Sequence, residues 1–318
     1  MNARRFWVSL SLLGALAAFS REAAADASLW QRAREPELAR SEALADKLER
    51  LLTMGDASRS PGVARDFALA AVAAADLAGA SRLPGARLKC LLGEVLVRAE
   101  FPRRARDLLA DVVEELPPGP LAASCYYSYG LSLACLGDAK GEIKAFTRAL
   151  AFTEGRGPRA NLLYNRADAR VAEGQLAEAI DDYRNAIALA NHPEITALAY
   201  YGLAVALDRY GDLPAAWVAL ESAHRVAPPF SGLPGADILD APSVFFVPAY
   251  EKDYYRALSQ MALARASDSA AERREHLLRA LEHWEAFIVA AERANDRYLE
   301  NARLHAFSCR RELEQRAR

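Results

Sequence analysis

The feature that most constrains the fold is a pattern that recurs four times between residues 86 and 228 with a fixed period of 37 residues. Its first two columns hold a small residue and then a turn residue: Gly93, Gly130, Ala167 and Ala204, followed by Glu100, Gly137, Gly174 and Gly211. The next two columns hold a large apolar residue and then a mostly small one: Leu109, Phe146, Tyr183 and Leu220, followed by Val112, Ala149, Ala186 and Ala223. This order predicts four pairs of antiparallel helices in close contact.

The columns place the helices of each pair. The first helices are expected near 86–99, 123–136, 160–173 and 197–210, and the second helices near 102–115, 139–152, 176–190 and 213–226. Proline and glycine gather at the junctions between pairs, as in Pro117-Pro118-Gly119-Pro120, and both residue types stop helices.

The third copy carries a family resemblance. Its sequence runs from Tyr164-Asn165-Arg166-Ala167 through Gly174-Gln175-Leu176-Ala177-Glu178-Ala179-Ile180 to Tyr183 and Ala186-Ile187, and it closely resembles the tetratricopeptide repeat. A unit of that family is ordinarily 34 residues long, and the surplus residues here fall between the hairpins. The resemblance implies an all-α fold, a right-handed α-α superhelical solenoid of helical hairpins. A generic helical bundle is the alternative, and four evenly spaced copies speak against it.

The flanking regions complete the predicted domain organisation. Residues 26–83 are interpreted as a degenerate capping hairpin, with helices near 29–54 and 63–78, and residues 84–228 hold the four repeats. Residues 229–249 form a linker insertion with the apolar centre Val244-Phe245-Phe246-Val247. Residues 250–318 are expected to form a degenerate fifth repeat and a capping helix near 295–316, which Tyr298, Leu304, Phe307 and Leu313 would attach to it.

The amino terminus resembles a secretory signal peptide, residues 1–25. Arg4 and Arg5 precede an apolar run from Phe6 to Phe19, and Ala23-Ala24-Ala25 offers small residues for cleavage. The apolar run is shorter than the roughly 20 residues that a membrane-spanning helix needs. We therefore expect an exported protein, periplasmic or secreted, without stable membrane insertion. An uncleaved N-terminal membrane anchor is the alternative.

Composition and net charge bear on the fold class and on the kind of partner. The 318 residues are 52% hydrophobic but only 8% aromatic, which favours a helical solenoid over a β-rich fold. The formal net charge of −2 gives no electrostatic reason to expect nucleic acid as a partner.

Four cysteines raise the question of disulfides, which an oxidising compartment would permit. Cys125 and Cys135 lie ten residues apart on one predicted helix, too far to bond with each other. Cys90 and Cys125 lie on neighbouring first helices and could meet. The expectation for all four, Cys309 included, is a buried thiol that fills the helical core.

The sequence contains no constellation typical of an enzyme. It lacks a phosphate-binding loop, a nucleophile elbow, a dinucleotide fingerprint and a zinc-protease motif. His276 and His283 lie two turns apart on one predicted helix and could share a metal, although exposed polar side chains explain them equally well. The neighbouring Asp181 and Asp182 point in different directions and are expected on an exposed face. We therefore expect no enzyme activity, no cofactor and no bound metal.

The tetratricopeptide resemblance implies a binding surface, because in that family the first helices line a concave groove. One groove position matches Tyr127, Tyr164 and Tyr201 in the second to fourth copies, and other groove positions of the four first helices hold Arg98, Asp168 and Arg209. Tyrosines one period apart suit recognition of an extended or helical protein segment. The alternative is that these rings pack helix against helix. Arg170 occupies a column of leucines and is expected to reach the groove or to pair with Asp168 or Glu173.

Together these features predict a non-enzymatic interaction scaffold of the cell envelope that binds a segment of another protein. Phe245 and Phe246 of the insertion are candidates to cover a helix edge or to occupy the groove. Two alternatives remain: an enzyme or ligand-binding protein with its site between the groove and residues 229–249, and a structural spacer without a defined ligand.

Overall fold

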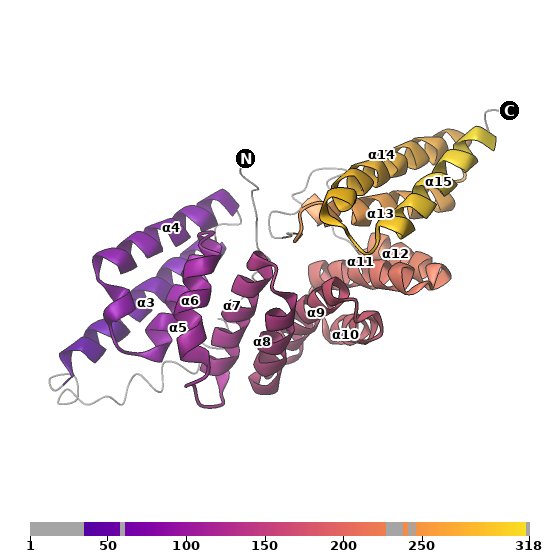
Figure 1. The fold of residues 1–318 in the computed structure, drawn as a ribbon. Helices are drawn as coiled ribbons and strands as arrows, with labels where there is room; N and C mark the ends of the chain where they lie inside the picture. Colours follow the sequence, from indigo (N-terminus) through magenta and orange to yellow (C-terminus); the bar gives the residue numbers. More distant parts are fainter. Residues whose placement is uncertain (1–34, 58–60, 227–237, 241–243, 245, 316–318) are drawn as a thin grey trace. The chain divides into compact units, whose positions relative to one another are not determined.

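A computed structural model of the chain describes residues 35–57, 61–226, 238–240, 244 and 246–315 (Figure 1). All regular secondary structure in these residues is helical, which confirms the expected all-α class for this part of the chain. The predicted signal peptide, residues 1–25, lies outside the described residues. The elements in chain order are α3 (Pro36–Ala57), α4 (Pro61–Leu77), η1 (Ala80–Arg82), α5 (Ala86–Arg98), α6 (Pro102–Val113), α7 (Pro120–Leu136), α8 (Ala139–Phe152), α9 (Arg156–Glu173), α10 (Leu176–Leu189), α11 (Pro193–Tyr210), α12 (Leu213–Val226), η3 (Ile238–Asp240), α13 (Glu251–Ala266), α14 (Ala270–Ala294) and α15 (Leu299–Gln315).

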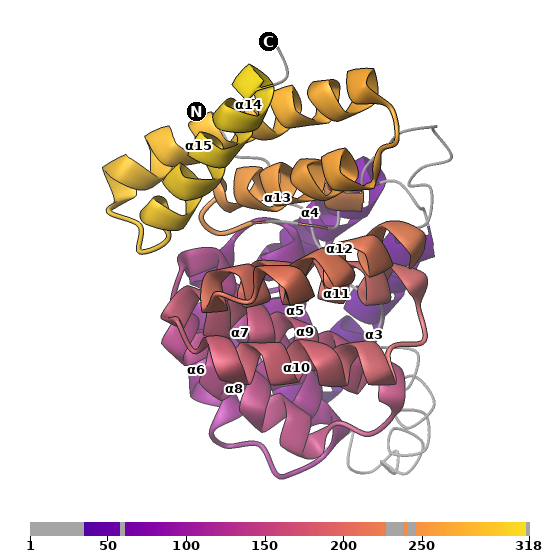
Figure 2. The same ribbon diagram turned by 90° about the vertical axis from the view of Figure 1, so that its right-hand side faces the viewer.

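Many helices that follow one another in the chain pack against each other, among them α7 and α8, α11 and α12, and α13 and α14. The chain divides into two compact units, and the boundary between them falls within α9. The N-terminal unit contains the described residues up to Ala169, and the C-terminal unit contains those from Arg170 onward. In the C-terminal unit α13 and α14 form a hairpin, and α15 folds back along α14 (Figure 2).

The helix limits follow the repeat pattern, with one systematic difference. The first helices of the second, third and fourth copies begin at Pro120, Arg156 and Pro193, three or four residues earlier than predicted. Pro120 and Pro193 are the first residues of their helices. Proline suits that position because its fixed φ is helical and its missing N–H would have had no partner there. These prolines therefore start the next helix as well as separating the repeats.

The four first helices end in the same turn. In each one the turn-column N–H donates to the carbonyl three residues earlier, and the next N–H donates to the carbonyl five residues earlier. This arrangement satisfies carbonyls at the helix end and requires a left-handed residue. The φ angles in the column are 64° at Glu100, 75° at Gly137, 78° at Gly174 and 99° at Gly211. Glycine adopts this conformation freely, so Glu100 is the strained member of the column.

The small-residue column is needed for close helix packing in the N-terminal unit. A Cβ atom on Gly93 would lie 2.5 Å from the side chain of Leu109, and one on Gly130 would lie 2.6 Å from the ring of Phe146. Each glycine therefore receives the large apolar residue of its own hairpin, as the columns predict. The pairing is confirmed for these two copies.

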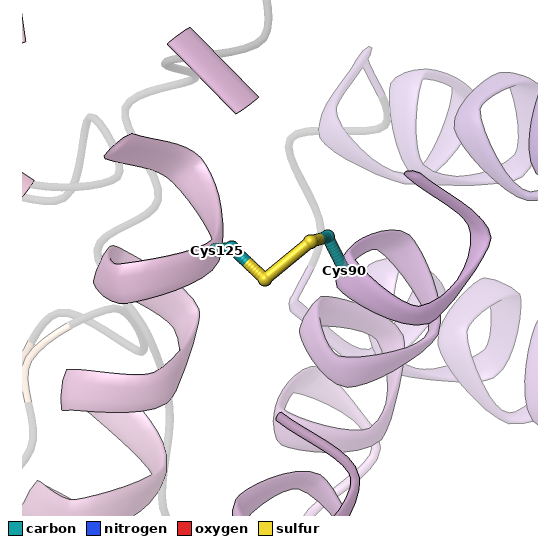
Figure 3. Close-up of a disulfide and its surroundings, with 2 residues drawn as sticks. All are labelled: Cys90 and Cys125. Carbon is teal, nitrogen blue, oxygen red and sulfur yellow. A yellow bond between two sulfur atoms is a disulfide. The ribbon is translucent and has the colours of Figure 1, made fainter. Parts of the chain in front are cut away.

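Cys90 on α5 and Cys125 on α7 form a disulfide, with their Cα atoms 5.1 Å apart (Figure 3). The expectation of a buried thiol is therefore wrong for this pair. It is confirmed for Cys135 and Cys309, which are buried thiols outside the disulfide. The sequence placed Cys90 and Cys125 on neighbouring helices, but only the rotation of those helices about their axes decides whether the two side chains face each other.

The fifth hairpin has an aromatic core. Tyr254 on α13 contacts Trp284 and Phe287 on α14 edge-on, with ring centres 4.8 Å and 5.0 Å apart, and all three side chains are fully buried. Tyr298, at the turn before α15, is also buried, as predicted for the capping helix.

The expected apolar contact of α15 is wrong at Leu304 and Phe307, whereas Leu313 is half-buried. Leu304 and Phe307 are 69% and 62% exposed, whereas Ala302, Ala306 and Cys309 form the buried face. These smaller residues allow α15 to approach α14 closely.

In the insertion between α12 and α13, the buried residues precede the predicted apolar centre, Val244–Val247. Ile238 and Leu239 of η3 are buried, and η3 packs against α11. Phe246 is half-buried and meets the ring of Tyr255 edge-on at 5.0 Å. Phe245 lies outside the described residues.

Candidate functional site

A line of polar side chains connects two consecutive first helices of the N-terminal unit. The hydroxyl of Tyr127 on α7 accepts a hydrogen bond of 2.9 Å from Nδ2 of Asn161 on α9. One turn later, Nδ2 of Asn165 donates to the backbone carbonyl of Asn161 at 2.7 Å and to its Oδ1 at 3.2 Å. Tyr127 and Asn161 are buried, while Asn165 is half-buried. The line therefore runs from the interior toward the surface.

An ion pair lies on α5, the preceding first helix, which packs against α7. Arg98 Nη2 donates to Glu94 Oε1 at 2.6 Å, and the two side chains are 12% and 15% exposed. Burial raises the pKa of Tyr127 to about 12, the Asn161 hydrogen bond works against that rise, and the Glu94 charge adds to it. The charges of the pair thus act on the Tyr127 hydroxyl. We refer to Glu94, Arg98, Tyr127, Asn161 and Asn165 as the polar strip.

Tyr164 and Asp168, one turn apart on α9, are both half-buried. They have the partial exposure expected of groove residues. Asp168 also acts on Glu142 of α8. Burial raises the pKa of the Glu142 carboxyl well above its usual value, and the Asp168 and Asp138 charges raise it further.

The other two tyrosines of the column do not have the expected exposure. Tyr127 and Tyr201 are buried, with 8% and 3% of their surfaces exposed. Tyr201 meets the ring of His224 edge-on, with centres 5.8 Å apart. The two rings therefore lack the partial exposure that a binding ladder would need, because neighbouring helices cover them. Of the two interpretations that the sequence left open, helix-to-helix packing applies to both residues.

Arg209, the groove candidate of the fourth copy, lies in the C-terminal unit with its side chain only 2% exposed. Its Nη2 donates to Glu251 Oε2 at 2.6 Å, and its guanidinium lies 4.3 Å and 4.0 Å from the ring centres of Tyr254 and Tyr298. Burial alone would lower the pKa of Arg209, but the charge of Glu251 outweighs it and raises the pKa. The side chain is enclosed by α13 and by the turn before α15.

Asp208, beside Arg209 on α11, joins the same enclosed region. Its Oδ2 accepts a hydrogen bond of 2.6 Å from the Tyr254 hydroxyl, and its Oδ1 lies 2.9 Å from Nε2 of His305 on α15. The Tyr298 hydroxyl donates to the carbonyl of Val171 at 3.1 Å. The chain's own carboxy-terminal helices therefore cover the ends of the first helices in this unit. No sequence motif indicates these contacts, because their partners lie 46 to 127 residues apart.

Arg170 pairs with Asp182 on α10, with 2.5 Å between Nη1 and Oδ2, and the same nitrogen donates to the carbonyl of Glu178 at 3.1 Å. Asp182 is consequently buried, and its expected place on an exposed face is wrong, whereas Asp181 is exposed. The pair joins the two helices of the third hairpin where the other copies use leucine.

The two histidines considered as metal ligands contact different partners. His276 Nδ1 lies 2.8 Å from Gln260 Oε1, and His283 Nδ1 lies 2.9 Å from Asp253 Oδ1. In the part of the chain that the structure describes, no three histidine, cysteine or acidic side chains are grouped so that they could hold a metal ion.

Comparison with known proteins returns no match, either to a protein-family model or to a curated protein. Among the described helices, none combines the length and the apolar character needed to cross a membrane. Because the comparisons assign no function, the polar strip and the half-buried Tyr164 and Asp168 are the main basis for a functional proposal.

Proposed function

We propose that this chain is a non-enzymatic interaction scaffold of the tetratricopeptide type, which binds a segment of another protein along the first helices of its N-terminal unit. In this proposal the repeats continue into a right-handed superhelical solenoid. The equal turns at the helix ends and the fit of Gly93 and Gly130 to their apolar partners support it, because equal hairpins stack in a regular way.

The observation that carries the proposal is the hydrogen-bonded line from Tyr127 to Asn161 and Asn165. It joins the Tyr127 hydroxyl on α7 to two amide side chains on α9 and ends at a half-buried asparagine. An amide offers both a donor and an acceptor, which suits the backbone of an extended segment. Tyr164 and Asp168 on the same helix add an aromatic surface and a charge, and aromatic side chains are common anchors in protein interfaces.

The test uses a peptide array that covers the exported proteins of the chain's own host. The peptide that binds the wild-type protein best is then titrated against Tyr164→Ala and Asn165→Ala. We expect each substitution to weaken binding by about 1–2 kcal/mol, roughly 5- to 30-fold, the usual loss at an interface anchor.

Tyr210→Ala is the matched control, because Tyr210 on α11 is 61% exposed and lies outside the polar strip. The control should leave the affinity unchanged. Equal losses in Tyr164→Ala and Tyr210→Ala, or an array on which no peptide binds, would contradict the proposed surface.

We also propose that the protein is exported and loses residues 1–25. The Cys90–Cys125 disulfide supports this proposal, because disulfides persist mainly in oxidising compartments. Mass spectrometry of the protein from the envelope or medium should find an amino terminus at or near Asp26. Titration of the unfolded protein should find two thiols before reduction and four after it. A mature chain that keeps Trp7 would favour the membrane anchor, and four thiols before reduction would remove the support from the disulfide.

A further inference from the structure

The insertion between α12 and α13 is longer than a connection between these hairpins requires. It spans the 24 residues between Val226 and Glu251, whereas α8 and α9 are joined by three residues, and so are α10 and α11. Three residues are therefore enough to pass from one hairpin to the next in this chain. Long insertions in compact arrays usually serve a purpose other than connection.

Three consecutive residues of this insertion, Ile238-Leu239-Asp240, contact neighbouring helices of the C-terminal unit. The first two contribute aliphatic side chains and the third contributes a carboxylate. Ile238 and Leu239 are 3% and 0% exposed, and the short helix η3 that they form packs against α11. Two adjacent aliphatic side chains are thus removed from water at one place on the repeat surface. Burial of this kind is the main source of affinity for a short bound segment.

Asp240 supplies the polar half of the contact. Its Oδ1 accepts a hydrogen bond of 2.7 Å from Lys252 Nζ on α13, and it also pairs with Arg256 one turn later. Burial works to raise the pKa of Asp240, but the two cations outweigh it and lower the pKa. Lys252 and Arg256 therefore form a basic pair that receives one carboxylate.

We propose that α11 and the Lys252–Arg256 pair of α13 form a docking site for a partner segment with two adjacent large aliphatic residues followed by Asp or Glu, and that Ile238–Asp240 occupies this site as an internal ligand. The whole recognition element is continuous in sequence, so a segment of another chain can present the same three side chains. The site shares no residue with the polar strip.

A competing segment can first contact the site at the Lys252–Arg256 pair, because these side chains are partly exposed. Lys252 and Arg256 are 29% and 27% exposed, and Asp240 is 47% exposed. An incoming carboxylate can therefore reach the basic pair from solvent while the aliphatic residues of the internal ligand are still bound. Displacement then proceeds from the acidic residue toward Leu239.

The probe is a fluorescent peptide with the sequence of residues 235–243, Gly-Ala-Asp-Ile-Leu-Asp-Ala-Pro-Ser, titrated into the full-length protein. In the wild type it must compete with a tethered copy of itself, whose effective concentration is in the millimolar range. The variant Asp240→Lys places a cation against Lys252 and Arg256 but leaves Ile238 and Leu239 unchanged. We expect this variant to bind the peptide at least tenfold more tightly than the wild type does.

A charge exchange tests the chemistry of the site. The double variant Lys252→Glu, Arg256→Glu should lose affinity for this peptide. It should instead bind a second peptide, in which lysine replaces the second aspartate. A third peptide, in which serine replaces leucine, should bind to none of the proteins. Arg279→Glu on α14 is the matched surface control. Circular dichroism establishes that each variant is folded. Equal peptide affinity in wild type and a folded Asp240→Lys variant, or the absence of the charge exchange, would overturn the proposal.

Discussion

Arg209 on α11 and Glu251 on α13 form an ion pair of 2.6 Å in which the arginine side chain is 2% exposed and the glutamate side chain 15% exposed. The pair connects the fourth repeat to the fifth hairpin, and the rings of Tyr254 and Tyr298 cover the guanidinium. A buried ion pair adds little compared with an apolar pair, but loss of one partner leaves a charge without compensation.

Glu251→Ala should therefore lower the free energy of unfolding by about 3–5 kcal/mol, because the charge of Arg209 stays buried. Urea unfolding followed by circular dichroism measures the change. Glu275→Ala is the control, since its partner Arg279 is 55% exposed, and exposed pairs contribute roughly 0–1 kcal/mol. Similar losses in the two variants would show that the Arg209 pair is not enclosed as described.

Glu100→Gly should stabilise the N-terminal unit by about 1 kcal/mol, because a residue with a Cβ atom is strained in the left-handed conformation that ends α5. Loss of the 3.4 Å pair between Glu100 and Arg65 costs little, since the Arg65 side chain is 45% exposed. The equivalent Gly137→Ala should destabilise by a similar amount. Thermal unfolding compares the two variants, and a destabilised Glu100→Gly protein would refute the strain.

Gly130→Ala tests the close approach of α7 and α8. The added Cβ would lie 2.6 Å from the ring of Phe146, so the substitution should destabilise by about 1–3 kcal/mol. Gly62→Ala on α4 is matched to it, because a Cβ there meets no atom within 4 Å. That control should be neutral or stabilising by roughly 0.5–1 kcal/mol, the usual preference for alanine in a helix. Tolerance of both substitutions in urea unfolding would contradict the packing column.

Glu142 should make stability depend on pH. Burial, and then the Asp168 and Asp138 charges, raise the pKa of its carboxyl in the folded protein above the usual 4.5. The folded state therefore holds this proton more tightly than the unfolded state, and stability falls as pH rises from 4.5 to the folded pKa. Glu142→Gln should melt like the wild type at about pH 4 and at an increasingly higher temperature than the wild type as pH rises.

Glu154→Gln is the control for this series, because Glu154 is exposed at the end of α8. Its melting temperature should follow that of the wild type at every pH. A difference between Glu142→Gln and the wild type that stays constant with pH would show that the carboxyl titrates normally.

The repeat pattern was sufficient to predict the helix pairs, their turns and the glycines that receive Leu109 and Phe146. It did not predict which groove candidates are exposed. Tyr164 keeps partial exposure, whereas Tyr127 and Tyr201, from the same column, are buried. The column shows that a residue lies on a given face of its helix, but the neighbouring helices determine how much of that face is covered. Asn161 and Asn165 were not predicted as site residues, because their equivalents in the other copies are not asparagine.

The sequence by itself determined the period, the helix pairs and the turn glycines, because these depend on backbone preferences and on contacts within about 40 residues of chain. Only the tertiary structure decided that Cys90 meets Cys125, that Arg209 is enclosed by Tyr254 and Tyr298, and that Ile238–Asp240 binds α11 and α13. These contacts depend on how whole helices are rotated and placed against one another. That placement results from many packing contacts together, and no short stretch of sequence records it.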